Sequence, residues 1–549
     1  MAAHHAETSD GKAAAPASSA WSPLRTPLFR AFWLAVLASQ IGTWMQNAGA
    51  AWLMTSLSHS PALVALMQTA TSLPVFLLGL PAGALADILD RRRLLLACQL
   101  WMLAAALTLA VVTLTGAITP ALLLALTFAI GLGVALSGPA WQATAPYLVP
   151  PSELPGAVAL NGVAVNLGRA VGPAVGGLLL AAAGTAAVFF ANSLSFVGLI
   201  VVAGLFWHPA RRTRTLPSER LPGAMRAGAR YLRHTPELRV VLVRTALFVG
   251  GASALFALLP VLARHTLGLG SSGFGLLLGM MGIGAILGAW QLPKLRRRTS
   301  PQRLTVGCTL VFAIALAALA LAGTAVEASA ALVVAGVAWI GMLTSLNVVA
   351  QVGPAPWVRA RALAAYLMVF QGGLALGSAG WGLVAEVTGT AAALGMAAAF
   401  LLVGLAAAAR YRLVADADRD MAPHVVADPP VADGLEPERG PVLVTVEYLI
   451  DPDDAGRFMS AAAEMGRIRR RDGAYRWGIY QDVAQPGRYL ETFLVESWLE
   501  HLRQHRRGTA ADARVRERLH AFHLGPDEPE VTHLLAAHRT SSRLTTARR

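Results

Sequence analysis

Residues 79–93 read Gly-Leu-Pro-Ala-Gly-Ala-Leu-Ala-Asp-Ile-Leu-Asp-Arg-Arg-Arg, and a long apolar run lies on either side of them. Gly79 and Gly83 are four residues apart, so on a helix they share one face and let a neighbouring backbone come close. Asp87 marks the point where that helix would leave the hydrocarbon of a bilayer. The turn that follows holds Asp90, Arg91, Arg92 and Arg93. This stretch predicts two membrane-spanning helices joined by a short basic turn.

The same arrangement returns 205 residues further along the chain. Gly284 and Gly288 repeat the glycine pair at this offset, and a basic triplet repeats in register with the first. The second triplet is Arg296, Arg297 and Arg298. More glycines follow the same offset: Gly168, Gly172 and Gly177 correspond to Gly373, Gly377 and Gly382. One offset that links separate sites indicates two copies of one unit, and parallel repeats are typical of transporters.

The composition also indicates a membrane protein. Of the 549 residues, 55% are hydrophobic and only 14% are charged, which is too little charge for a soluble protein of this size. The two cysteines, Cys98 and Cys308, both fall inside apolar runs and are expected to be small core residues rather than a disulfide framework.

Twelve apolar segments are long enough to span a bilayer, which takes about 20 residues. They lie near 30–57, 61–86, 93–115, 119–141, 156–183, 186–206, 239–264, 271–292, 303–323, 329–351, 361–387 and 389–411. We therefore expect an all-α membrane protein whose twelve transmembrane helices form two six-helix pseudo-repeats. A small soluble α+β domain with a ferredoxin-like fold is expected to follow them.

The distribution of Lys and Arg predicts the orientation, because cytoplasmic loops carry an excess of positive charge. Nearly all basic residues near the spans fall on one side, with Arg264 as the exception. Both termini are therefore expected in the cytoplasm, with the chain a multi-pass protein of the cell (inner) membrane. A nucleic-acid surface is the weaker interpretation of the net charge of +14, because the basic clusters are divided among short loops. No nucleic-acid partner is expected.

The chain divides into seven predicted parts. These are a disordered tail (1–25), a first six-helix half (26–206), a basic cytoplasmic linker (207–238), a second six-helix half (239–412), an acidic, Pro-rich linker (413–440), the soluble domain (441–540) and a last tail (541–549). No signal peptide is expected, because the first apolar run is too long for one.

The stretch from Gly83 to Leu95 resembles the loop motif that follows the second helix in the major facilitator superfamily. Gly83, Leu85, Asp87, Arg91 and Leu95 match it, whereas Ile88 and Asp90 depart from the usual Arg and Gly. The resemblance implies a cytoplasmic gate in which Asp87 contacts the start of a helix from the other half. The gate would comprise Gly83, Asp87, Asp90, Arg91, Arg92, Arg93, Arg296, Arg297 and Arg298. The alternative is a simple boundary that ends a span.

The fifth span contains a glycine-rich stretch that resembles the signature of exporters in the same superfamily. The matching residues are Gly168, Gly172, Pro173, Gly176 and Gly177, while Ala159 stands where a further Gly is expected. The resemblance implies an outward-directed carrier. Close packing of a glycine face is an equally good explanation.

Arg169 lies well inside the same apolar run, where a cation is costly and needs a partner or water. We expect it either to line a central cavity and meet an anionic or carbonyl-rich substrate, or to tie the helix to backbone carbonyls. The predicted cavity residues are Gln40, Trp44, Asn47, Asn166, Arg169, Asn347 and Gln371. Each of the polar ones is individually more typical of contacts between helices.

The soluble domain shows the order strand, helix, strand, strand, helix, strand, with the second helix expected from Trp498 to about Phe522. It resembles the antibiotic-biosynthesis-monooxygenase type of ferredoxin fold, which leaves dimerisation through this domain open. Its candidate site residues are Trp477, Tyr489, Trp498, His501 and His505. His501 and His505 lie one helical turn apart, which allows a metal-binding pair, but a solvated helix face is the expected role.

The first helices resemble the branch of the superfamily that contains enterobactin exporters and macrolide efflux proteins, the transmembrane secretion effector type. The residues that carry this are Gln40-Ile-Gly-Thr-Trp-Met-Gln, Ala51-Trp-Leu and Ser60-Pro. The resemblance implies a proton-driven secondary exporter of amphiphilic small molecules such as siderophores or antibiotics, without a cofactor. The alternative is a membrane-tethered monooxygenase-like enzyme. No phosphate-binding Gly-x-x-x-x-Gly-Lys-Ser/Thr loop is found, which argues against an ATP-driven pump.

Overall fold

The computed structural model describes residues 21–142, 144, 148–206, 230–355, 357–411, 413, 420–422, 424, 429 and 435–537. For residues 80, 83–84, 86–88, 142, 151, 170, 206, 360 and 407–408 it describes the backbone only. The predicted terminal tails and most of both predicted linkers lie outside these ranges, as do the side-chain surroundings of Gly83 and Asp87.

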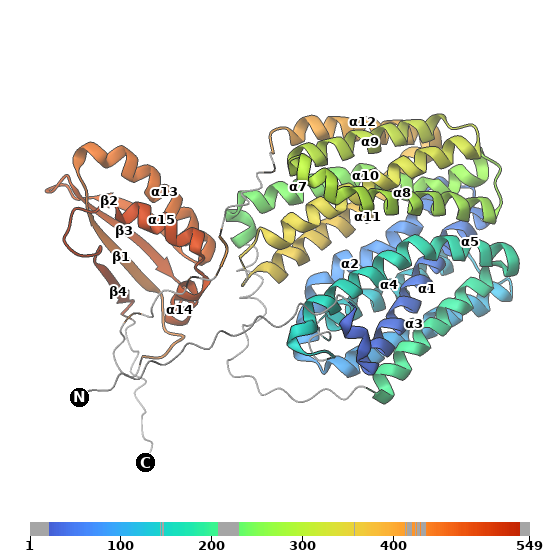
Figure 1. Ribbon diagram of the computed structural model, residues 1–549, viewed down its shortest axis with the longest axis horizontal. Coiled ribbons are helices and arrows are strands. Elements are labelled where there is room, and N and C mark those ends of the chain that lie inside the picture. The colour runs from blue at the N-terminus through green and yellow to red at the C-terminus, as the bar shows by residue number, and fades with distance from the viewer. Residues whose placement is uncertain are drawn as a thin grey trace, which may run out of the picture.

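Long helices form the first three quarters of the chain (Figure 1). The first helix set comprises α1 (Pro27–Leu57), α2 (Pro61–Ile88), α3 (Arg91–Leu114), α4 (Pro120–Gln142) and α5 (Leu154–Val201). The second helix set comprises α7 (Pro236–Val261), α8 (Ser271–Arg298), α9 (Pro301–Leu321), α10 (Ala325–Val352), α11 (Arg359–Thr388) and α12 (Thr390–Ala408). The two sets lie side by side.

The sequence accounts for where these helices begin. Proline occupies the first turn of several of them, where its missing N–H costs nothing. The Ser60 side chain caps α2 by accepting a hydrogen bond from the Leu63 N–H, and Ser300 caps α9 in the same way. Asp90 also acts as a cap, because it accepts a 2.8 Å hydrogen bond from the Arg93 N–H at the start of α3. Its carboxylate is therefore engaged within its own turn.

Helix α5 spans 48 residues, about twice the length needed for one crossing, and it breaks at Gly184. The backbone there has φ 78° and ψ 177°, a conformation that only glycine adopts readily. The break falls between the predicted segments 156–183 and 186–206. Gly389, which lies 205 residues later, has φ 86° and ends α11.

Nine stretches of the described residues are helical, long and apolar enough to cross a membrane. They are Pro61–Gly79, Arg91–Leu114, Pro120–Trp141, Leu154–Leu205, Pro236–Thr266, Ser271–Arg298, Pro301–Leu321, Ala325–Val352 and Arg361–Thr388. One of them covers both arms of α5, and neither α1 nor the shorter apolar α12 is included. Large apolar side chains on their outer surfaces are exposed, including Leu321 and Val387 at 86% each, as a lipid environment requires.

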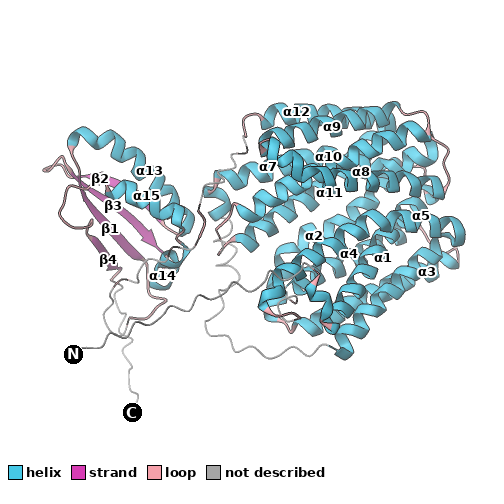
Figure 2. Cartoon of the chain, in the orientation of Figure 1, coloured by secondary structure: helices cyan, strands magenta, loops and turns pink. Residues whose placement is uncertain are grey.

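The C-terminal domain is a four-stranded antiparallel sheet with helices on one face (Figure 2). Its strands β1 (Val442–Leu449), β2 (Tyr475–Gln481), β3 (Arg488–Val495) and β4 (Val531–Leu535) lie in the order β2-β3-β1-β4. Its helices are α13 (Ala455–Asp472), α14 (Trp498–Arg507) and α15 (Ala510–His520). Tyr448 and Tyr489 pair across β1 and β3, and Phe458 of α13 packs on both rings.

The single helix predicted from Trp498 to about Phe522 is wrong, because the chain breaks between α14 and α15. Gly508 adopts an extended conformation there, with ψ 145°. Thr509 then starts α15 with a capping box, in which its hydroxyl and the Asp512 carboxylate each bond to the other residue's backbone N–H. This capping pattern was present in the sequence and was not recognised.

Candidate functional site: a cavity between two helix sets

The two helix sets touch mainly at one end of the helical part. We call the end that carries Arg91–Arg93 and Arg296–Arg298 the basic end, and the end where α2 and α8 begin the far end. At the far end, Gly177 of α5 faces Gly275 of α8 so closely that a Cβ on either residue would collide with the other backbone. A Cβ at Gly382 of α11 would likewise collide with the Ala65 side chain of α2. Glycine at these positions allows the two sets to pack together.

Polar contacts reinforce this closure. Glu386, at the end of α11, accepts hydrogen bonds from the Ser60 hydroxyl at 2.6 Å and from the Ala62 N–H at 3.2 Å. Its carboxylate therefore sits at the N-terminus of α2, where the helix dipole favours negative charge. Thr69 of α2 donates a hydrogen bond of 2.8 Å to the Ala375 carbonyl of α11.

Contact between α2 and α11 continues as far as Phe76, which packs against Gly372. Gly79, three residues nearer the basic end, has no atom within 4 Å of the position that a Cβ would occupy. The prediction that a neighbouring backbone lies close to Gly79 is therefore wrong for this conformation, whereas its counterpart Gly284 does pack against Val333 of α10. The described contacts join the sets at the far end and become sparser toward the basic end.

Arg169 lies behind this closure, on the face of α5 that looks toward the second helix set. Its guanidinium lies 5.2 Å from the centroid of the Trp44 ring of α1, in cation–π geometry. Tyr366 of α11 is close enough to interact with it electrostatically. Within the described ranges no carboxylate lies within 4.0 Å of Arg169 and no hydrogen bond from it is seen. Its guanidinium is thus half-buried against the Trp44 ring, and its donors have no hydrogen-bond partner among the described residues.

A second buried arginine shows what a structural tie looks like in this chain. Arg244 of α7 donates from Nε to the Tyr411 carbonyl at 2.8 Å and from a terminal nitrogen to the Thr305 hydroxyl at 2.9 Å. It is only 3% exposed. Arg244 has the hydrogen-bond partners expected of a structural tie, whereas the half-buried Arg169 has none among the described residues. The two arginines thus illustrate the two roles expected of a cation inside a span.

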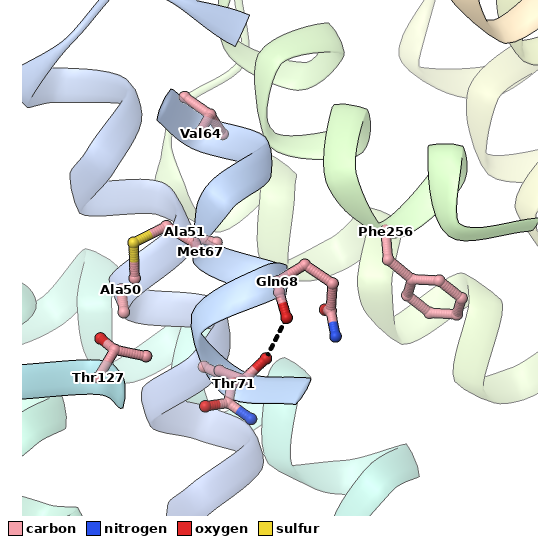
Figure 3. Close-up of a pocket in the computed structure, with 9 residues that line it drawn as sticks. Ala50, Ala51, Val64, Met67, Gln68, Thr71, Thr127 and Phe256 are labelled. Carbon is pink, nitrogen blue, oxygen red and sulfur yellow. Dashed lines mark hydrogen bonds between the residues drawn. The ribbon is translucent and has the colours of Figure 1, made fainter. Parts of the chain in front are cut away.

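A small cavity of about 30 Å³ lies between the two sets, toward the far end (Figure 3). Asn47 of α1, Gln68 and Thr71 of α2, Thr127 of α4 and Phe256 of α7 contribute to its wall. The Thr71 hydroxyl donates to the Gln68 carbonyl at 2.8 Å, which is the hydrogen bond drawn in Figure 3. The Gln68 side chain lies between this hydrogen bond and the Phe256 ring. The first helix set therefore contributes the polar groups of the wall, and the second set contributes an apolar ring.

A larger cavity of about 140 Å³ lies inside the first helix set, among α1, α3 and α4. Gln40, Thr43, Gln99 and Trp141 are among the residues that line it. Gln99 is 7% exposed, and its side-chain oxygen has no hydrogen-bond partner among the described residues.

The predicted cavity residues are only partly brought together. Gln40 lines the larger cavity, Asn47 lines the smaller one, and Trp44 stacks with Arg169. Asn166 is exposed and donates a hydrogen bond to the Gly162 carbonyl of its own helix. Asn347 and Gln371 are half-buried on the second helix set. The Asn347 side-chain oxygen accepts a hydrogen bond from the Gln351 amide.

Other polar residues inside the spans join helices. The Asn192 amide donates to Gln46, and both side chains are almost completely buried. The Trp141 indole N–H donates to the Asn161 side chain at 2.9 Å. Sequence reasoning did not single out Gln68, Thr71 and Phe256 as wall residues, because nothing local in the sequence shows which helix faces meet.

The glycines of the exporter-like stretch pack mainly against α1. Gly168 faces Gln40, Gly172 faces Trp44 and Gly176 faces Met45, each with a backbone atom within 3.1 Å of the position a Cβ would occupy. Pro173 lies within the same helix. Three glycines of this stretch thus serve packing within the first set, and Gly177 serves packing between the sets.

At the basic end, the arginines of the predicted gate make different contacts. The Arg92 guanidinium donates to the carbonyls of Ala203 and Gly204, just beyond α5, and so ties α3 to that segment. Arg93 and the triplet Arg296–Arg298 are exposed. Gly83 and Asp87 contribute backbone only to the described structure, so their part in a gate stays a prediction.

Comparison with known proteins identifies the family. The family profile described as transmembrane secretion effector matches residues 18–541. The chain belongs to this family. This secretion effector is a multi-pass membrane transporter of the major facilitator type rather than an enzyme.

Curated relatives cover about half of this chain. The staphyloferrin A transporter of Staphylococcus aureus (strain NCTC 8325 / PS 47) is 24% identical over 283 residues, which are 50% of this chain and 69% of the relative. The enterobactin exporter of Shigella boydii serotype 4 (strain Sb227) is 29% identical over 297 residues, 52% of this chain and 67% of the relative.

Solved structures with a similar fold are more distant in sequence. A bacterial homologue of the human lysosomal transporter Spinster, in an inward-facing and unoccupied conformation, has a TM-score of 0.58 at 17% identity and covers 71% of this chain and 98% of its own. A bacterial homologue of the iron transporter ferroportin, in the inward-facing state, has a TM-score of 0.55 at 16% identity and covers 70% and 98%. These similarities show the fold of the helical part.

In this secretion effector the C-terminal domain contacts the basic end of the second helix set. Tyr231, just before α7, packs edge to face on Trp357, just before α11, with ring centroids 5.5 Å apart. The Arg507 guanidinium of α14 lies 4.7 Å from the Trp357 ring, and that of Arg471 lies 5.8 Å from Tyr231. Figure 1 shows the sheet domain beside this end of the helices. Burial raises the pKa of the Tyr231 hydroxyl.

The charged residues at this contact are paired. Arg230 forms an ion pair of 3.2 Å with Glu500 of α14, and Arg507 forms one of 2.7 Å with the same carboxylate. Arg471 bonds to Asp472 and Asp512. Burial raises the pKa of Asp472, whereas hydrogen bonds from Arg471 lower the pKa of Asp512 despite its burial. The guanidinium groups that lie on the aromatic pair are therefore fixed by carboxylates.

We expect Trp357→Ala to loosen the domain from the helices, because it removes the ring beneath the Arg507 guanidinium. Cation–π contacts of this kind contribute about 0.5–2 kcal/mol. Backbone hydrogen exchange in α14 should rise several-fold, measured by mass spectrometry on the full chain. Trp290→Ala serves as control, because Trp290 has a comparable contact with Lys294 on α8, 4.9 Å from the ring. Equal protection of α14 in both variants and the parent would contradict the docking contact.

The candidate residues of the C-terminal domain have separate roles. Trp477 donates from its indole N–H to Glu491 at 2.8 Å, and Tyr489 packs in the core. His501 and His505 do lie together, but His501 is only 2% exposed, so a solvated helix face is the wrong interpretation. Burial, followed by the nearby His505 and His533, lowers the pKa of His501 to about 3.

Proposed function

We propose that this chain exports a small, oxygen-rich amphiphilic molecule of the siderophore class by alternating access, driven by the proton gradient. The observation that carries this proposal is Arg169, a half-buried cation whose donors have no hydrogen-bond partner among the described residues, behind a closed contact between two helix sets. Siderophores bind iron through carboxylate, catecholate or hydroxamate oxygens, which a guanidinium recognises by charge-assisted hydrogen bonds. The similarity to a staphyloferrin A transporter and to an enterobactin exporter favours the same class.

The helical part is proposed to contain twelve transmembrane helices in two six-helix repeats. Glycines at the 205-residue offset pack between corresponding pairs of helices, which supports this. Gly131 of α4 packs on Pro74 of α2, as Gly336 of α10 packs on Met281 of α8. Three further glycine pairs have the same offset. Gly172 packs against α1 as Gly377 packs against α7, and Gly177 and Gly382 both make contacts between the two sets. Gly184 and Gly389 both have positive φ.

The basic end is proposed to face the cytoplasm, as are both termini, because arginines are concentrated there. With the far end closed, the structure would then represent the state open to the cytoplasm. The cytoplasmic gate of Gly83, Asp87 and the two arginine triplets would form when the sets rock and the basic end closes. The Asp87 carboxylate would then lie at a helix N-terminus of the other set, in the way that Glu386 lies at the start of α2.

The C-terminal domain is proposed to be an accessory module of the monooxygenase-like ferredoxin type that can dimerise. Its strand order supports the fold type. The sheet face opposite the helices carries exposed apolar side chains, including Tyr480 at 61% and Leu534 at 50% exposure. These would be covered in a dimer formed through the sheets.

Transport into inverted membrane vesicles tests the proposed function. Vesicles containing the full chain would be given labelled siderophores of the carboxylate, catecholate and hydroxamate types, together with amphiphilic antibiotics, and energised by respiration. We expect saturable accumulation of at least one siderophore, independent of ATP and abolished by an uncoupler. Uptake seen only in right-side-out vesicles, or accumulation unaffected by the uncoupler, would refute a proton-driven exporter.

A further inference from the structure

The C-terminal domain brings together three histidines from two elements. His501 and His505 lie on α14, and His533 lies on β4, where it pairs with Val444 on the helix-covered face of the sheet. Their ring centroids are 4.7 Å apart for His501 and His505, and 4.8 Å apart for His501 and His533. One nitrogen from each ring lies within 4.8 Å of one nitrogen from each of the others. We propose that these three imidazoles bind a divalent transition metal ion of the Zn²⁺ type.

The separation of the nitrogens fits such an ion after small movements. Zinc binds imidazole nitrogens at about 2.0–2.1 Å, so two ligands of a tetrahedral ion lie roughly 3.4 Å apart. The His505 and His533 rings are half-buried, so the proposal requires them to rotate about their side-chain bonds to cover the difference. Three neutral nitrogens leave the fourth position to water or to a ligand oxygen, the arrangement typical of an open zinc site.

Unpartnered nitrogens point to a missing ligand. The Nε2 atoms of His501 and His533 are buried and have no hydrogen-bond partner among the described residues. A buried polar atom without a partner is costly and uncommon in a folded protein. A metal ion accepts the lone pair of a neutral imidazole nitrogen and removes this cost.

A neighbouring amide prepares His501 to be a ligand. Its Nδ1 lies 3.2 Å from the Gln504 side-chain oxygen. In the tautomer that carries its proton on Nδ1, this contact is a hydrogen bond and the lone pair on Nε2 is left for the metal ion. Metal-binding histidines usually have such a second partner for the other ring nitrogen. The Trp498 ring packs on both His501 and His533, with centroids 5.4 and 5.7 Å away, and holds them in place.

The nearby charge does not prevent binding. Arg469 is the cation that acts on His501 and His533, and its Nε lies 3.4 Å from the buried carboxylate of Glu491. Its guanidinium also lies over the Phe493 ring, 4.8 Å from the centroid. Its charge is thus compensated locally. The site therefore needs no carboxylate ligand to offset this arginine, and three neutral imidazoles suffice.

The position of the site gives the ion a structural consequence. Helix α14 is held to the helical part through Glu500 and Arg507, on the side that faces Arg230 and Trp357. The same helix carries two of the three imidazoles toward β4. An ion between α14 and β4 would therefore stabilise the helix through which the domain is docked.

Metal binding by the full chain, purified without a histidine tag, tests this proposal. Co²⁺ would be titrated and followed by its visible ligand-field absorption, and Zn²⁺ by equilibrium dialysis and elemental analysis. We expect one tetrahedral Co²⁺ per chain, displaced by Zn²⁺. In the double variant His505→Asn and His533→Asn this site should be lost, with at least a 100-fold fall in affinity. These two side chains are half-buried, so the fold should be retained, as circular dichroism would show.

The matched control is the double variant His59→Asn and His265→Asn. These rings are 5.4 Å apart at the far end and form the other close histidine pair in the described residues. This control should retain full binding, and single variants at His505 and His533 should each weaken it. Absence of a bound ion in the parent, or equal stoichiometry and affinity in the parent and the His505/His533 variant, would overturn the proposal. The measurement does not depend on transport, so the proposed function is tested separately.

Discussion

Arg169→Ala should reduce export by about 10- to 100-fold while the protein still reaches the membrane. Hydrogen bonds to a charged group contribute about 1.5–3 kcal/mol, and each 1.4 kcal/mol corresponds to a factor of ten. In the described structure the Arg169 donors are not engaged by a carboxylate, and the guanidinium rests on Trp44 at 5.2 Å. Its loss should therefore remove substrate contacts rather than packing. The rate would be measured in inverted vesicles normalised to the amount of protein.

Two matched variants separate recognition from a structural role. Arg169→Lys keeps the charge but loses the planar fork that binds two oxygens, so we expect intermediate export and weaker affinity. Arg244→Ala removes the arginine whose donors are bonded to Tyr411 and Thr305, and should lower the yield of folded protein instead. If Arg169→Ala behaves like Arg244→Ala, with little folded protein and normal export by what remains, Arg169 is a structural tie.

Gly177→Ala should favour an open far end and slow turnover. A Cβ at Gly177 would collide with the Gly275 backbone, so α5 and α8 must separate before the variant can close. Overpacking of this kind costs about 1–3 kcal/mol, which shifts a two-state equilibrium about 5- to 150-fold. We expect a corresponding fall in export. A cysteine at Thr71, in a background without Cys98 and Cys308, should react several times faster with an impermeant maleimide added outside intact cells.

Gly162→Ala is the control on the same helix, because nothing lies within 4 Å of the position its Cβ would occupy. Both variants gain the same helix propensity, about 0.5–1 kcal/mol, so any difference between them reports the collision. Labelling and export that are the same in Gly162→Ala and Gly177→Ala would show that the Gly177–Gly275 contact does not limit the cycle.

The helical part was largely predictable because its signals are local or periodic. Apolar runs need no partner to be recognised, and the 205-residue offset depends only on glycine spacing. Even so, Gly79 lacks, among the described residues, the close neighbour that its spacing predicts, and Asp90 caps α3 in this conformation, so its part in a gate stays a prediction. A motif shows which residues are special without showing in which state of a moving protein they make their contacts.

The sites between elements were less predictable. His533 stands on a strand far from His501 and His505 in the chain, and only the pairing of β4 with β1 brings it to α14. Tyr231 and Trp357 lie on separate segments that meet only because α7 and α11 start at the same end. The pairing of Gly177 with Gly275 likewise depends on how two helix sets approach. Such contacts follow from tertiary packing, which composition and periodicity do not encode.

The docking of the C-terminal domain has a practical consequence. Every described anchor on the helical side, Arg230, Tyr231 and Trp357, precedes a helix of the second set. If the two helix sets rock as proposed, the sheet would therefore move together with the second set. One fluorophore on the outer sheet face and a second at the exposed end of α3 would then report each conformational change of the carrier as a change in energy transfer. Neither probe would lie in the transport pathway.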